Sequence, residues 1–312
     1  MHLPTLALTF AILLRPALTT PLLDFSAANG DPPSTLGILN LEEARDEKIS
    51  ANTNDLYIKL ATDPHGVPAL HYHRKQSYIR AEYHALANQV EENKTYYIGY
   101  KFSLGVIEQS LMIFQFKAYA GNNAATHGAN IPLSLEFKSG QLHLQYQADS
   151  SSGREPQWSR TVDPDTVYSV GVVIHTGRPG WVEFYFDGEQ QVLGDAGATR
   201  LSANTWTGRT EPKFGAYRGE AVAIDTYVYR VQIGTEVGDI AEAAGLDGGS
   251  TSSVSAGAAG SKTASANASA AATSAPAAGS CSWEGHCAGA SCATEDDCSD
   301  ALVCAGGKCV SS

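Results

Sequence analysis

Short β-rich runs separated by turn-forming residues recur along residues 21–245, and this pattern constrains the fold more than any other feature of the chain. Long helical periodicity is absent, and turn signals such as Ser139-Gly140 and Asp187-Gly188 separate the runs. The runs are Leu56–Leu60, Ser77–His84, Tyr96–Leu104, Ser110–Ala118, Leu133–Phe137, Gln141–Gln147, Val167–His175, Trp181–Phe186, Pro212–Tyr217 and Ala221–Ile233. So many strands in one domain predict an all-β fold of two stacked antiparallel sheets, a β-jelly roll or concanavalin-like sandwich, with one short helix near Thr235–Ala244.

The first 19 residues have the features of a secretory signal peptide. Their apolar core, Leu6–Leu14, is too short to span a bilayer, and small residues follow it. No later stretch is apolar for as many as 18 residues, so no membrane anchor is expected in the mature chain. The sequence therefore predicts a secreted, extracellular protein whose jelly-roll domain covers residues 20–245.

All six cysteines lie in the last 32 residues, 281–312. An even number of closely spaced cysteines behind a signal peptide predicts a small module with three disulfides, because so short a segment cannot bury a sufficient core. No C-x2-C pair is present, which disfavours a zinc site, and the sequence leaves the disulfide pairing open. Residues 246–280, almost entirely Ser, Ala, Gly and Thr, predict a flexible linker, and the module is expected to bind cell-wall glycan.

Three predicted strands each have a polar face and an apolar face. Side chains alternate along a strand, so Arg80, Glu82 and His84 share one face of the first. In the second strand Gln115 and Lys117 share a face opposite two phenylalanines. In the third strand Lys213, Gly215 and Tyr217 are expected on one face, with the glycine leaving room for a ligand. A solvated outer face with ordinary cross-strand ion pairs is the simpler interpretation of each strand alone, but together they indicate a polar cleft.

These strands resemble the three signature strands of alginate-lyase-type jelly rolls, R-x-E-x-R, Q-[IV]-H and Y-x-K-x-G-x-Y-x-Q. The chain has R-A-E-Y-H, Q-F-K and E-P-K-F-G-A-Y-R-G in the same order. Over residues 50–235 it is most similar to fungal glucuronan lyases (polysaccharide lyase family 20), and more distantly to heparinase-type lyases. It departs from the signatures where His84 replaces Arg, Lys117 replaces His, and Glu211 and Gly219 replace Tyr and Gln. These departures argue against alginate as the substrate.

The resemblance implies a secreted lyase that cleaves β-1,4-linked glucuronan or a related polyuronate by β-elimination, without a cofactor. The reaction needs a group that neutralises the uronate carboxylate, a base for the C5 proton and an acid for the departing O4. Gln115 and Arg80 suit the carboxylate, with Lys117 or Lys213 assisting. Tyr217 is the expected acid, and it can serve as base too if Lys213 and Arg218 favour its phenolate.

Histidines are the other candidate bases. His71 and His73 share a face if their segment is a strand, and His84 is a third candidate; for each, a structural role is the competing interpretation. Lys117, Glu82, His84, His71 and Arg218 are expected to contact the substrate. Asp225, on a late strand, is a candidate ligand for a structural calcium.

The formal net charge of −12 argues against a nucleic-acid partner, although a basic cleft on an acidic body can still bind an acidic polysaccharide. Two other functions fit the same sandwich. A glycoside hydrolase would use Glu82 with Glu183 or Glu136 as its carboxylate pair. A non-catalytic glycan-binding protein would use Trp158 or Trp206 as a stacking platform.

Overall fold

A computed structural model describes residues 21–44, 47–118, 130–246, 288–289, 291 and 302–311 of the protein. Two large antiparallel sheets form the body of this part of the chain, as the alternating runs predicted. Within the described residues the helices are short 3-10 segments, η1 (Pro33–Leu36) and η3 (Val237–Ile240); the second lies inside the segment expected to be helical. No helix in this part of the chain is both long and apolar enough to cross a membrane.

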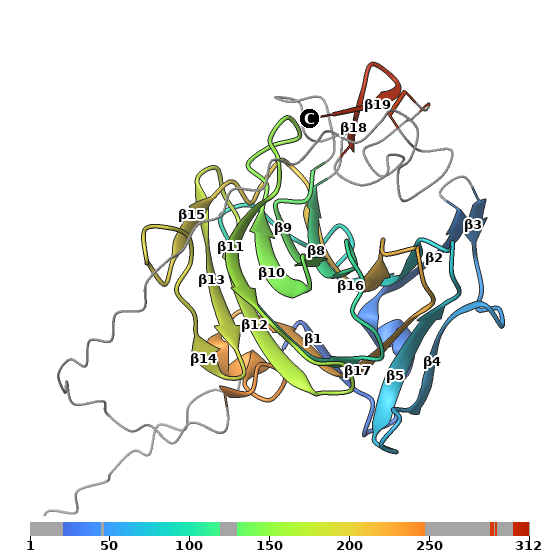
Figure 1. The fold of residues 1–312 in the computed structure, drawn as a ribbon. Helices are drawn as coiled ribbons and strands as arrows, with labels where there is room; N and C mark the ends of the chain where they lie inside the picture. The colour runs from blue at the N-terminus through green and yellow to red at the C-terminus, as the bar shows by residue number, and fades with distance from the viewer. Residues whose placement is uncertain are drawn as a thin grey trace, which may run out of the picture.

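The two sheets lie one inside the other (Figure 1). The eight-stranded sheet contains, in spatial order, β11 (Glu155–Arg160), β10 (Gln141–Tyr146), β9 (Leu133–Lys138), β8 (Met112–Ala118), β16 (Thr210–Tyr217), β6 (Arg80–His84), β2 (Ile38–Ala44) and β3 (Glu47–Ile49). The nine-stranded sheet curves around it and contains, in order, β14 (Glu189–Gln190), β13 (Gly180–Phe186), β12 (Tyr168–His175), β7 (Thr95–Leu104), β17 (Ile224–Gly234), β5 (Pro68–Arg74) and β4 (Leu56–Thr62). Two short strands join this sheet at its sides, β1 (Leu23–Ser26) beside β17 and β15 (Leu201–Ala203) beside β13.

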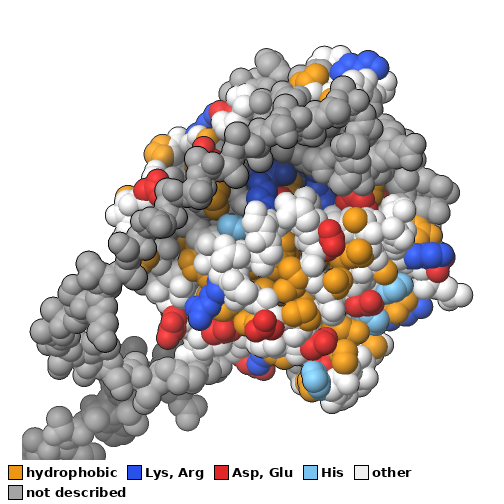
Figure 2. All heavy atoms as spheres, in the orientation of Figure 1, with side chains coloured by type: hydrophobic (Ala, Val, Ile, Leu, Met, Phe, Trp, Pro, Cys, Tyr) orange, Lys and Arg blue, Asp and Glu red, His pale blue; other side chains and the backbone are white. Residues whose placement is uncertain are grey.

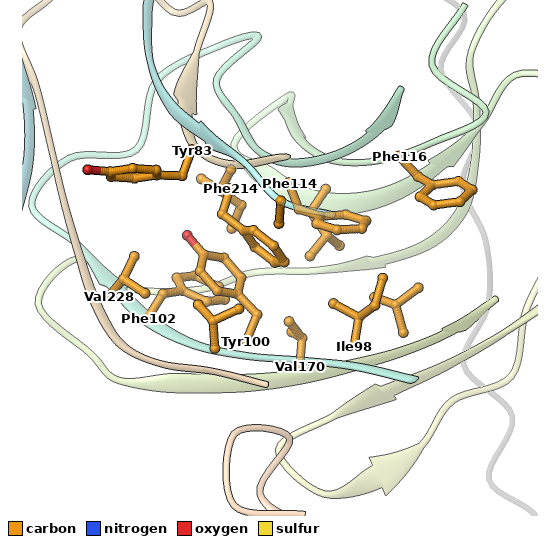
Figure 3. Packing of buried hydrophobic residues seen from close by; sticks show 14 of the residues in the cluster. Tyr83, Ile98, Tyr100, Phe102, Phe114, Phe116, Val170, Phe214 and Val228 are labelled. Carbon is orange, nitrogen blue, oxygen red and sulfur yellow. The ribbon is translucent and has the colours of Figure 1, made fainter. Parts of the chain in front are cut away.

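The hydrophobic core fills the space between the sheets. Phe114 and Phe214 project from the eight-stranded sheet toward Tyr100 and Phe102 of β7, and Phe116 lies further along the core, on the side of Ile98 (Figure 3). The Tyr100 ring lies 5.2 Å from Phe214 and 5.0 Å from Phe102, so aromatic contacts join the two sheets. Since side chains alternate along a strand, the residues between these core positions face away from the core. We call this outward surface of the eight-stranded sheet the cleft face.

The C-terminal module is described only in part. A hairpin of β18 (Leu302–Ala305) and β19 (Lys308–Ser311) pairs Cys304 with Cys309 in register, and Cys309 is buried and disulfide-bonded. The signal peptide, residues 247–280 of the linker and Cys281, Cys287, Cys292 and Cys298 lie outside the described residues. The three disulfides and the glycan-binding role of the module therefore stay predictions.

Candidate active site

The three signature strands are neighbours in the eight-stranded sheet, in the order β8, β16, β6. Lys213 of β16 pairs with Gln115 of β8 on one side and with His84 of β6 on the other. Ser134 pairs with Gln115, and Gln145 pairs with Ser134, which extends the row across two more strands. We call these five residues the cleft row. Adjacent strands lie about 4.8 Å apart, so the row is long enough for several sugar units.

Lysine and arginine side chains gather in a hollow over β8 to β10, with carboxylates beside them (Figure 2). The cleft that the sequence predicts to be basic therefore also contains acidic residues among its cations. Arg80 Nη1 lies 2.5 Å from Glu42 Oε1, and Arg154 Nε lies 3.1 Å from Glu136 Oε2. Buried charged side chains need partners of opposite charge, because moving an unpaired charge out of water costs roughly several kcal/mol.

Arg80 and Gln115 are joined through Glu82. Gln115 Nε2 donates a 2.5 Å hydrogen bond to Glu82 Oε1, and the other Glu82 oxygen lies 3.1 Å from Arg80 Nε. The Arg80 guanidinium also lies 4.7 Å from the centre of the Tyr217 ring. Glu82, predicted to contact substrate, is 1 % exposed and acts here as the bridge that holds Gln115 and Arg80 in place.

His84 forms a dyad with Glu211, the acidic residue that replaces the first tyrosine of the signature. His84 Nε2 lies 2.5 Å from Glu211 Oε2, while Arg209 Nε and the Asn88 backbone N–H bind the Oε1 atom at 2.8 and 2.5 Å. Burial opposes ionisation of this carboxyl, but the hydrogen bonds from His84, Arg209 and Asn88 prevail and lower its pKa to about 2. Glu211 is therefore ionised near neutral pH and holds the Nε2–H tautomer of His84.

Exposure along the cleft row is greatest at the His84 end. Gln145 and Ser134 are 0 % exposed, Gln115 1 %, Lys213 5 % and His84 9 %. Both polar atoms of the Gln145 side chain and the Ser134 hydroxyl have no hydrogen-bond partner among the described residues. Buried polar groups without partners are uncommon and favour a polar ligand or water at the site.

Tyr217 lies away from the cleft row. Its ring is fully buried with Ile79, Met112 and Ile131, and it pairs in register with Arg80 rather than with His84. Tyr217 is four residues from Lys213 along an extended strand, a span of about 13 Å. Arg218, the other residue at this end of β16, is also buried, and its charge lies 5.7 Å from the Tyr217 ring.

Gly215 was predicted to line the cleft, and the structure shows that it does not. The register between β16 and β8 shifts between Phe214 and Tyr217, and Gly215 has φ of 141°. A Cβ atom there would point toward the core, 2.8 Å from carbons of the Tyr72 ring and 2.2 Å from the Ala81 carbonyl oxygen. This bulge leaves the cleft face of β16 without a side chain between Lys213 and Tyr217, where the Glu82–Gln115 hydrogen bond crosses from β6 to β8.

The structure does not bring His71 and His73 into the cleft. Both are on β5 of the nine-stranded sheet, where Leu70, Tyr72 and Arg74 face inward and the two histidines face outward. They contact Asp225, the predicted calcium ligand, on the adjacent strand β17. The prediction that His73 acts as the base and His71 contacts the substrate in the cleft is therefore wrong. The period of two gives the common face of the two histidines but not the sheet to which they belong.

Two residues on which the hydrolase and glycan-binding alternatives depend also lie outside the cleft. Glu183 is on β13 of the nine-stranded sheet and pairs with Arg200 at 2.6 Å, so it cannot form a carboxylate pair with Glu82. Trp158 packs against Phe184 and Phe186, with ring centres 4.8 and 5.1 Å away, which uses its faces in the core rather than for sugar stacking.

Sequence reasoning did not assign a role to Glu211, Glu42 or Arg154. Glu211 has the same parity as Lys213 on one strand, so the period of two could have placed it on the cleft face. Glu42 is on β2, which lies between β6 and the edge strand β3 of the eight-stranded sheet. No strong alternating run marks that strand, and only the fold brings Glu42 to Arg80.

No family model matches the chain. Two curated relatives, both endo-chitosanase C of Aspergillus oryzae, match short segments: 70 % identity over 33 residues, 11 % of this chain and 9 % of that protein, and 60 % over 38 residues, 11 % and 10 %. The chain thus spans about a tenth of the length of the curated relatives it matches.

Among solved structures, the chain is similar to polysaccharide lyases. An endo-β-1,4-glucuronan lyase from the fungus Trichoderma reesei has 17 % identity and a TM-score of 0.45, covering 65 % of this chain and 97 % of that one. The family 7 alginate lyase A1-II′ has 15 % identity and a TM-score of 0.42, covering 62 % and 92 %. An alginate lyase from Corynebacterium sp. has 11 % identity and a TM-score of 0.44, covering 65 % and 97 %. These are the classes of lyase that the signature strands resemble.

Proposed function

We propose that the cleft row cleaves β-1,4-linked glucuronan, or a related polyuronate, by β-elimination outside the cell. The observation that carries this proposal is the pairing of Gln115, Lys213 and the His84–Glu211 dyad on three adjacent strands. An amide, a cation and an oriented imidazole are the groups that proton abstraction next to a carboxylate requires. The secretory signal peptide predicted at residues 1–19 supports an extracellular site of action.

Lys213 and Gln115 bind the carboxylate of the uronate at which the bond is cut. Gln115 keeps one amide hydrogen for the substrate while the other is donated to Glu82. The ammonium group of Lys213 neutralises the carboxylate, so negative charge that develops at C5 in the transition state is stabilised. Arg80, held between Glu42 and Glu82, positions Glu82 and through it Gln115.

His84 removes the C5 proton. Its Nε2 atom is bound to Glu211, so Nδ1 is the nitrogen that acts as the base. The electrons of the C5–H bond form the C4–C5 double bond as the C4–O4 bond breaks. In glucuronate a single group can take the proton from C5 and give it to O4. The imidazolium of His84 therefore passes this proton to the departing O4, while Glu211 stabilises the positive charge that the imidazolium has in between.

Tyr217 has a structural role in this proposal. Its ring is buried, and Tyr217 is about 13 Å from Lys213 along β16, so we assign the proton transfer near His84 to the imidazole rather than to the Tyr217 hydroxyl. The ring packs under the Arg80 guanidinium and thereby supports the network around Glu82.

A hydrolase is the weaker candidate for the same cleft. Of its two expected carboxylate pairs, Glu82 with Glu136 is the one that stays on the cleft face. Glu82 contacts Arg80 and Gln115, and Glu136 contacts Arg154. A hydrolase needs one carboxyl to donate a proton to the leaving oxygen, and these contacts leave neither carboxyl positioned as a donor.

The test measures ultraviolet absorbance while the enzyme acts on glucuronan, alginate and a neutral β-glucan. We expect absorbance from the unsaturated product to rise on glucuronan and to fall at least about 100-fold in His84→Gln, because proton transfer by a positioned side chain contributes about 10²–10⁴-fold. Tyr217→Phe should keep its rate within about tenfold of wild type. His175→Gln, on the opposite sheet, is the matched histidine control.

Full activity in His84→Gln together with loss of activity in Tyr217→Phe would overturn the assignment of His84 and restore the tyrosine mechanism. Absence of any absorbance change on every polyuronate would overturn the lyase function itself.

A further inference from the structure

A second cluster of titratable side chains lies on the outer face of the nine-stranded sheet, on the side of the sandwich opposite the cleft. His71 and His73 project from β5, and Asp225 projects from the adjacent strand β17, in register with His73. His71 Nε2 and His73 Nδ1 lie 2.6 and 2.7 Å from the same oxygen, Asp225 Oδ1. The three ligand atoms lie within 4.8 Å of one another.

Aromatic rings hold both imidazoles in place. His73 stacks on Tyr57 of β4 with ring centres 4.9 Å apart, and His71 stacks on Tyr227 of β17 at 4.6 Å. The Tyr57 hydroxyl lies 3.4 Å from His71 Nδ1, the nitrogen that faces away from Asp225. A hydrogen bond to the outer nitrogen of an imidazole is the contact that orients histidine ligands in metal sites, because it directs the lone pair of the other nitrogen inward.

The cluster does not fit calcium, the ion suggested for Asp225. Calcium takes six to eight oxygen ligands, and here two of the three donors are imidazole nitrogens. The carbonyl oxygen of Asp225 is also in use, since it accepts the Gly105 backbone N–H at 2.9 Å. Imidazole nitrogens with one carboxylate are instead the donors preferred by zinc and other first-row transition metals.

We propose that His71, His73 and Asp225 form a binding site for a divalent transition-metal ion, with Zn²⁺ as the reference ligand. Three protein ligands leave the fourth position of a tetrahedral ion for water or a ligand from outside. The side chains are 15 %, 23 % and 35 % exposed, so an ion can reach them from solvent.

Small side-chain movements complete the site. At zinc-to-ligand distances of about 2.0–2.1 Å, tetrahedral ligand atoms are separated by roughly 3.3 Å. Each imidazole must therefore move away from Asp225 Oδ1 by about 0.7 Å, and the two histidine nitrogens, which lie within 4.8 Å of each other, must approach by at most about 1.5 Å. Metal binding replaces the protons that now link the nitrogens to Oδ1. A nearby cation is Lys59, whose ammonium lies 4.4 Å from the centre of the Tyr57 ring. Lys59 is exposed and water screens it, so its repulsion of the ion is weak.

The experiment titrates ZnCl₂ into the full untagged chain after chelator treatment, with calorimetry as the readout. We expect one saturable site that Asp225→Asn weakens at least about tenfold and that His71→Ala/His73→Ala removes. Bound Co²⁺ should give visible absorption in wild type and not in the double variant. His175→Ala, which removes a histidine elsewhere on the same sheet, should bind Zn²⁺ as wild type does.

Equal Zn²⁺ affinity and stoichiometry in wild type and Asp225→Asn would overturn the proposal, as would calcium that displaces Zn²⁺ at matched concentration. Far-ultraviolet circular dichroism without metal establishes that each variant is folded. Asp225→Asn preserves the shape of the side chain, so it carries the test if the double variant does not fold. None of these readouts depends on lyase activity.

Discussion

Glu211 offers a quantitative test of the cleft network. Its pKa falls from 4.5 to about 2 in the folded protein. Each tenfold change in acidity corresponds to about 1.4 kcal/mol, so ionised Glu211 stabilises the fold by roughly 3 kcal/mol. Because the pKa is lowered on folding, this stability is fully present above pH 4.5 and is lost as pH falls toward 2. More than half of it should be gone by about pH 3.

The perturbation is Glu211→Gln, which keeps the shape and removes the charge. Urea unfolding followed by tryptophan fluorescence at pH 7, 5, 4 and 3 gives the free energy of unfolding of both proteins. We expect the variant to be less stable by about 3 kcal/mol at pH 7, and the difference to shrink steadily below about pH 5.

Glu183→Gln is the matched control, since Glu183 also pairs with an arginine, Arg200, whose side chain is 55 % exposed. An exposed pair of this kind contributes about 0–1 kcal/mol. A difference between wild type and Glu211→Gln that stays constant from pH 7 to 3 would refute the reasoning, because the stabilisation would then not come from the ionised carboxylate.

Two further changes test the backbone and the surface. Gly215→Ala should lower the free energy of unfolding by more than about 2 kcal/mol, because its Cβ would overlap the Tyr72 ring and the Ala81 carbonyl oxygen. The control is Gly238→Ala, where a Cβ meets nothing within 4 Å, and it should change the free energy of unfolding by less than about 1 kcal/mol. Equal losses in the two variants would contradict the bulge geometry. Asn93 is exposed in a turn before β7 and begins an Asn-Lys-Thr sequon, so Asn93→Gln should remove one glycan from the secreted protein by intact mass; an unchanged mass would show that the turn is not glycosylated.

Much of the fold could be predicted from alternation in the sequence. Phe114 and Phe116 enter the core while the alternate residues Gln115 and Lys117 do not, as a period of two requires. The resemblance of three strands to lyase signatures also identified segments that the sheet places side by side. Alternation was sufficient there because each strand has one apolar and one polar face.

Register and sheet membership could not be predicted. A bulge turns Gly215 toward the core and separates Tyr217 from Lys213, and no local pattern marks where a strand gains an extra residue. His71 and His73 share a face as predicted, but that pattern is the same in either sheet. Their place beside Asp225 depends on the pairing of β5 with β17, which is a long-range contact.

Mass spectrometry of the oligosaccharides released from glucuronan tests the central claim most directly. β-Elimination predicts that every product with a newly formed non-reducing end is one water lighter than the corresponding hydrolysis product, since that end contains a C4–C5 double bond. New non-reducing ends of full hydrolytic mass would contradict the lyase and favour the Glu82–Glu136 hydrolase. Polymer that is bound but not shortened would contradict both and indicate a glycan-binding protein.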